Sequence, residues 1–73
     1  MSYAFRGFGL IAIGESIYPC EVLDRSRTGA TLRFKLSRKL PPNFFLQVDR
    51  QRDDLRECAV IWQDHDEAGV LFI

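Results

Sequence analysis

The stretch Ala30-Thr31-Leu32-Arg33-Phe34-Lys35-Leu36 alternates strictly between apolar and polar side chains. Successive side chains of a β-strand point to opposite faces, so the apolar members would share one face and the polar members the other. This two-residue period is typical of a strand that is buried on one side. The sequence therefore predicts a half-buried β-strand over this stretch.

Strand-like runs occupy most of the remaining chain. They lie at Phe8–Ile13, Ile17–Leu23, Phe44–Val48, Leu55–Gln63 and Gly69–Ile73. No stretch of about ten residues carries apolar side chains at the spacing of a helix face, so we expect little or no helix beyond a single turn at Ser37–Leu40. Six short strands at hairpin spacing predict an all-β fold. A six-stranded antiparallel β-barrel is expected, because closure removes exposed strand edges.

The sequence predicts three further details of these strands. Pro19 has no backbone N–H, so the start of its strand is expected at a sheet edge or a bulge. Cys58, Val60 and Trp62 occupy alternate positions and are expected to point the same way. The run of alternating charges Asp49–Asp54 is interpreted as a solvated hairpin loop.

The composition limits the classes of function. The 73 residues are expected to form a single domain, 1–73, and the hydrophobic share of 47% is high enough for a folded core. Ten basic and ten acidic residues cancel, whereas proteins that bind nucleic-acid polymers usually carry a basic excess. The balance argues against a nucleic-acid polymer as partner, but a small anionic ligand can still be held by two or three local arginines.

Targeting signals and cysteines bear on the compartment. The sequence has no apolar run long enough to cross a membrane and no secretory leader pattern, so we expect a cytoplasmic protein without a membrane partner. Cys20 and Cys58 are isolated and flanked by strand-forming residues. Two buried thiols in a reducing compartment are expected, with one disulfide as the alternative.

The most concentrated polar chemistry lies in the turn Asp24–Gly29. Closing a hairpin explains part of it, since Asp and Ser side chains bond nearby backbone N–H groups and Gly29 can adopt a positive φ. Closure does not require the extra length, nor the arginines Arg25 and Arg27 on either side of Ser26. The turn therefore has two interpretations, a structural closure and a ligand-binding site.

The turn and its surroundings resemble the PilZ domain family. Asp24-x-Ser26-x-x-Gly29, followed by Ala30 and an alternating strand, is similar to the family's DxSxxG motif. Flanking segments extend the similarity in the family's order, namely Cys20-Glu21-Val22, Leu40-Pro41-x-x-Phe44-x-Leu46, and Cys58–Trp62 followed by Gly69-Val70-x-Phe72. The resemblance covers the chain from around Ile11 to Phe72.

This resemblance implies a barrel of the split-barrel type that binds the bacterial second messenger cyclic di-GMP. In the family, an RxxxR motif near the N-terminus and the DxSxxG turn grip the ligand. Arginine forks bind phosphates and stack on guanine, while a carboxylate accepts hydrogen bonds from the guanine N–H edge. The expected ligand-binding residues are Arg6, Asp24, Arg25, Ser26, Arg27 and Gly29.

The chain departs from the family pattern in the RxxxR motif. Only Arg6 is present, with Ser2 four residues before it and Leu10 four residues after it. Arg6 matches the second arginine of the motif. Loss of the first is expected to weaken ligand binding roughly ten- to a hundred-fold, unless Arg25 or Arg27 compensates.

Three features outside the turn also bear on function. Trp62 is expected in the core or at its rim, although an indole can also stack on a base. His65 stands among acidic residues without the spacing of a known metal site, so we expect a solvated turn and no metal. Apolar positions such as Leu71 and Ile73 need a cover, which predicts self-association or a protein partner.

The leading hypothesis is a cytoplasmic, non-enzymatic receptor or adaptor in cyclic di-GMP signalling, which relays ligand binding to a protein partner and uses no cofactor. The alternative is a degenerate PilZ-like barrel that binds no nucleotide and serves as a protein-interaction or assembly module. The missing first arginine favours this alternative. A third, weaker hypothesis is a small barrel for single-stranded nucleic acid, against which the zero net charge argues.

Overall fold

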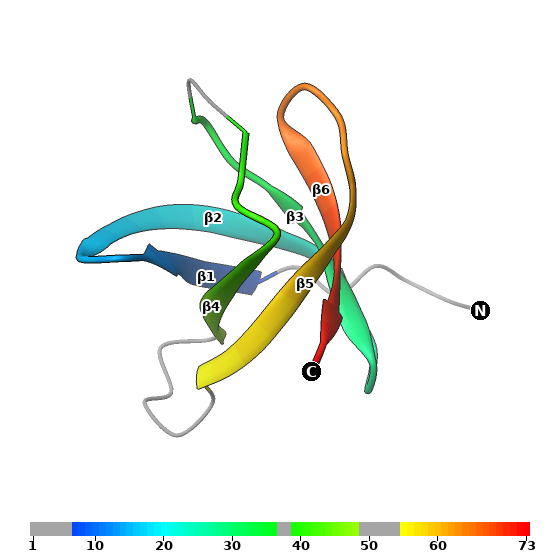
Figure 1. The fold of residues 1–73 in the computed structure, drawn as a ribbon. Helices are drawn as coiled ribbons and strands as arrows, with labels where there is room; N and C mark the ends of the chain where they lie inside the picture. The colour runs from blue at the N-terminus through cyan, green and yellow to red at the C-terminus, as the bar shows by residue number, and fades with distance from the viewer. Residues whose placement is uncertain (1–6, 37–38, 49–54) are drawn as a thin grey trace.

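The computed structural model describes residues 7–36, 39–48 and 55–73. They form six strands: β1 (Gly7–Ile13), β2 (Ser16–Arg25), β3 (Gly29–Arg33), β4 (Asn43–Val48), β5 (Leu55–Gln63) and β6 (Glu67–Phe72). The strands close into a barrel in the order β1-β2-β3-β6-β5-β4, with every neighbouring pair antiparallel (Figure 1). The described residues contain no helix, and so none that could cross a membrane. The predicted six-stranded antiparallel barrel is confirmed.

The third strand is shorter than its alternating sequence predicts. β3 ends at Arg33, whereas the pattern continues to Leu36. Phe34 donates its backbone N–H to the carbonyl oxygen of Asp66, in the β5–β6 turn, at 2.9 Å, so the chain leaves the ladder with β6 at this point. The Phe34 side chain is still buried in the core. The expected turn at 37–40 lies partly outside the described residues, and the expected loop at 49–54 lies wholly outside them.

β1 and β2 form a tight hairpin around Gly14 and Glu15. Gly14 has a φ of 60°, in the left-handed region that glycine adopts readily and that the tight two-residue turns of hairpins require at their first central position. Further along, Pro19 pairs with Leu10 of β1, while the ladder between β2 and β3 begins only at Glu21. Pro19 therefore lies at an open edge of β2, as predicted, where its missing N–H costs no ladder hydrogen bond.

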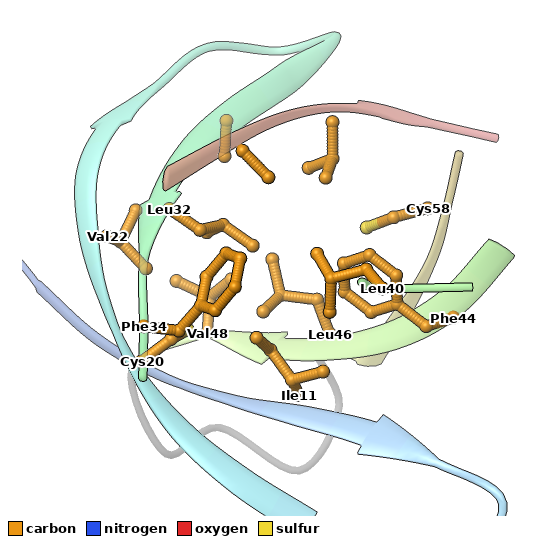
Figure 2. Close-up of a cluster of buried hydrophobic side chains, with 13 residues drawn as sticks. Ile11, Cys20, Val22, Leu32, Phe34, Leu40, Phe44, Leu46, Val48 and Cys58 are labelled. Atoms are coloured by element: carbon orange, nitrogen blue, oxygen red, sulfur yellow. The ribbon is translucent and has the colours of Figure 1, made fainter. Parts of the chain in front are cut away.

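A cluster of thirteen buried apolar residues fills the barrel (Figure 2). Every strand contributes at least one member, and Phe34 and Leu40 enter from the connection between β3 and β4. Among the described residues, no polar or charged side chain is buried with them. A binding site for a polar ligand on this part of the chain therefore belongs to the outer face or to the ends of the barrel.

Cys20 and Cys58 belong to this core, and both are free thiols. Burial raises the pKa of Cys20 to about 12 and that of Cys58 to about 11. The prediction of two buried thiols is confirmed, and the disulfide alternative is wrong. Because the thiolate is the reactive form of cysteine, both side chains are inert at neutral pH.

Candidate functional site

Ser26 closes the turn that was predicted to carry the site. Its backbone N–H donates to the carbonyl oxygen of Gly29 at 2.8 Å. Its hydroxyl oxygen accepts the backbone N–H groups of Thr28 and Gly29, both at 3.2 Å, and lies 3.2 Å from the Thr28 hydroxyl. One serine side chain thus satisfies two backbone donors of the turn, which fixes the positions of the residues on either side of it.

Gly29 is required for a reason that differs from the expected one. Of the described glycines, only Gly14 has a positive φ, so the expectation of a left-handed Gly29 is wrong. A Cβ built on Gly29 would instead overlap the carbonyl oxygen of Val70 in β6. The backbones of β3 and β6 approach too closely here for any side chain, and glycine is the residue that permits this approach.

A β-bulge in β5 turns Trp62 to the outside of the barrel. Val60 pairs with Val70, but the register then shifts by one residue, so that Trp62 pairs with Gly69. The extra residue, Ile61, reverses the alternation of side chains along the strand. The expectation that Trp62 points the same way as Val60 is therefore wrong, and 45% of Trp62 is exposed to solvent.

A second bulge sets the register on the other side of the site. It lies at Leu23 of β2, after which Asp24 pairs with Thr31 of β3. Thr31 in turn pairs with Gly69 of β6. One cross-strand row therefore runs over the outer face through one residue each of β2, β3, β6 and β5, namely Asp24, Thr31, Gly69 and Trp62.

This row lies along a groove of about 230 Å³ on the outer face. The indole of Trp62 lies against Gly69, where a Cβ would overlap its ring atoms. An exposed carboxylate at Asp24 and a hydroxyl at Thr31 stand in the same groove. A flat ring for stacking beside a carboxylate acceptor suits a planar ligand that carries N–H groups on its edge.

The six predicted site residues divide into three groups. Asp24, Arg25, Ser26 and Gly29 line the outer groove. Arg27 is exposed in the turn and lines a neighbouring pocket instead. Arg6 lies outside the described residues. The structure therefore brings together the turn half of the predicted site.

The groove also contains residues that were not predicted to belong to it. Thr31 is one, because in the sequence it is an ordinary polar position of an alternating strand. Leu71 is another, and 45% of it is exposed beside the turn. A glycine inside a strand often marks a close approach of other groups. Gly69 is therefore the feature of the sequence that indicates packing of another side chain on this face.

Arg33 is an outer-face arginine with a structural role. Its Nη2 donates to Glu67 Oε2 at 2.9 Å, and its Nη1 lies 3.8 Å from Glu21 Oε1. The hydrogen bond to Glu67 raises the pKa of Arg33 above its ordinary value. Arg33 is therefore committed to neighbouring carboxylates.

The acidic loop between β5 and β6 is closed by its own hydrogen bonds. Asp64 Oδ1 accepts the backbone N–H of His65 at 2.9 Å, and the Asp64 N–H donates to the Glu67 carbonyl oxygen at 2.8 Å. In the part of the chain that the structure describes, no three His, Cys, Asp or Glu side chains are grouped to hold a metal ion.

Comparison with protein-family models, with curated proteins and with solved structures gives no match to this chain.

Proposed function

We propose that this barrel is a receptor for cyclic di-GMP, bound in the outer groove between the Asp24–Gly29 turn and Trp62. The observation that carries the proposal is the cross-strand row that joins the Asp24 carboxylate to the Trp62 indole beside that turn. The resemblance of the turn to the DxSxxG motif supports the same location from the sequence.

A guanine base suits the chemistry of this groove. Stacking of a base on an aromatic side chain contributes about 1–3 kcal/mol, and Trp62 offers an exposed ring. The Watson–Crick edge of guanine carries two neighbouring N–H donors, and the exposed carboxylate of Asp24 accepts such a pair. Thr31, between the two, adds a hydroxyl that can donate or accept.

In this proposal, the arginines of the turn bind the phosphates of the ligand. Arg25 and Arg27 stand on either side of Ser26, whose hydrogen bonds hold the turn closed. A guanidinium fork binds a phosphate through two parallel hydrogen bonds. A local pair of arginines gives this contact without a basic excess over the whole chain, which is neutral.

Exposed apolar residues around the groove provide a surface through which ligand binding is relayed to a partner protein. Ile61 and Leu71 line it and are exposed, and Ile73, directly after β6, is also exposed. A ligand in the groove covers part of this apolar surface and changes what a partner protein meets. Such coupling requires the partner to bind the liganded and free forms with different affinities.

Calorimetric titration with cyclic di-GMP tests the proposal. Asp24→Asn and Trp62→Ala should each weaken binding about ten-fold or more, since each removes a contact of about 1.5 kcal/mol or more. The matched controls are Asp66→Asn in the β5–β6 turn and Phe45→Ala on β4, both exposed and away from the groove. Absence of binding at high micromolar ligand by the folded wild-type protein would sink the receptor function.

A protein-interaction module remains the second candidate, and one observation favours it. Ala12 of β1 pairs with Ile17 on one side and with Phe45 on the other, so these residues form one outward row. Ile17 is 64% exposed and Phe45 is 46% exposed. Light scattering over a range of protein concentrations tests this candidate, because a Phe45→Glu variant should stay monomeric where the wild type associates.

A further inference from the structure

A second pocket, at one end of the barrel, is lined by three arginines. It has a volume of about 470 Å³ and is bounded by Arg25, Ser26, Arg27 and Arg56. None of the described residues that line it is acidic. The pocket shares Arg25 and Ser26 with the outer groove, so the two adjoin at the turn.

Phe72 brings Arg56 to this end of the barrel. The backbone N–H of Phe72 donates to the carbonyl oxygen of Thr28 at 2.7 Å, which fastens the end of β6 to the β2–β3 turn (Figure 1). The guanidinium carbon of Arg56, on β5, lies 5.1 Å from the centre of the Phe72 ring. This is the distance of a cation–π contact, which holds the guanidinium beside the turn.

Three arginines from two separate parts of the sequence thus line one pocket. Arginine carries its donors in a planar fork that matches the oxygens of a phosphate, and a shared anion offsets the repulsion among like charges. Arg33, on the outer face, does not line this pocket and is held by Glu67 and Glu21. The chemistry of the pocket is therefore that of a phosphate site.

We propose that this pocket is a phosphate-binding subsite and that Arg56 is one of its ligand-contacting residues. The inference rests on the proposed function, in which a guanine of cyclic di-GMP stacks on Trp62. The pocket would then bind a phosphate of the same ligand molecule. Because Arg25 and Ser26 line both, the groove and the pocket form one continuous path for such a ligand. Arg56 supplies a guanidinium that lies outside the turn motif.

Two probes and two matched variants test the subsite. Inorganic pyrophosphate is titrated at constant ionic strength while the Nε–H resonances of all arginines are followed by NMR, and cyclic di-GMP is titrated in parallel by calorimetry. Saturable shifts are expected at Arg25, Arg27 and Arg56 but not at Arg33. Arg56→Gln should weaken binding of each probe about ten-fold or more, while Arg33→Gln, with the same change in charge, should leave it within about two-fold.

The outcomes separate the subsite from the proposed function. Pyrophosphate binding that depends on Arg56, without cyclic di-GMP binding, supports the subsite and overturns the receptor function. Cyclic di-GMP binding that is unchanged in Arg56→Gln overturns the subsite and leaves the receptor function standing. The subsite is also overturned if neither probe binds the wild-type protein, whose fold is checked by circular dichroism.

Discussion

The indole of Trp62 lies against the backbone of Gly69, across the ladder that joins β5 and β6. The bulge in β5 makes this pair possible by turning Trp62 outward, and glycine leaves the space that the ring occupies. The outer groove therefore depends on a residue that has no side chain. Gly69 is a positioning residue for the groove, and its substitution should change the groove without touching the turn.

The first prediction concerns Gly69→Ala. The new Cβ would overlap the Trp62 ring, which is a side chain at the surface and can swing away. We expect a modest loss of stability, about 1 kcal/mol, together with a shift of tryptophan fluorescence to longer wavelength. Gly14→Ala is the control, since strain at its positive φ lowers stability without moving Trp62. Unchanged emission in Gly69→Ala would contradict the packing of the indole on this residue.

The second prediction concerns Gly29→Ala. Here the new Cβ would meet the carbonyl oxygen of Val70, which belongs to the β6 backbone and cannot swing away. The free energy of unfolding should fall by about 1–3 kcal/mol, and the melting temperature by roughly 4–8 °C for each kcal/mol. Thermal unfolding measured beside Gly69→Ala should therefore give the larger loss for Gly29→Ala, and the reverse order would refute the close approach of β3 and β6.

Most of the fold could be predicted from local patterns. The alternation of Ala30–Leu36 gives the inward face of β3 because one buried face selects one register. The open edge at Pro19 follows from the missing N–H, and the closing role of Ser26 follows from ordinary turn chemistry. Each of these features depends on residues that are near one another in the chain.

The outer groove could not be predicted in the same way. It depends on one-residue register shifts at Leu23 and at Ile61, and no residue type in either strand marks them. A shift by one residue moves every later side chain to the other face. The strict alternation correctly turned Cys58 and Val60 toward the core and therefore misplaced Trp62. The need for Gly29 was equally hidden, because it arises from a strand that lies about forty residues further along the chain.

The third prediction concerns Ser26→Ala. The substitution removes the oxygen that accepts the N–H groups of Thr28 and Gly29, both at 3.2 Å. The turn is exposed and water can replace part of the loss, so we expect about 1 kcal/mol of destabilisation. Ser16→Ala, at an exposed position in the β1–β2 hairpin, serves as the control. Urea unfolding of both variants tests whether the hydroxyl closes the turn, and equal stabilities would contradict that role.

The fourth prediction concerns the pH dependence of stability. Burial raises the pKa of Cys20 from 9.0 to about 12 and that of Cys58 from 9.0 to about 11. The unfolded chain therefore releases these two protons at a lower pH than the folded protein does. Their contribution to stability is present in full below pH 9 and is lost as the pH rises toward 11 and then 12.

Unfolding in urea with a reductant present, at half-unit steps above pH 8, measures this loss. Each thiol should add about 1.4 kcal/mol per pH unit to the decline once the unfolded chain ionises. The Cys20→Ala variant is less stable at neutral pH because the substitution leaves a small cavity. Above pH 9 its free energy of unfolding should fall less steeply than that of the wild type, by the contribution of one thiol. Equal slopes would show that the Cys20 thiol ionises as easily in the barrel as in the unfolded chain, and so that water reaches the core.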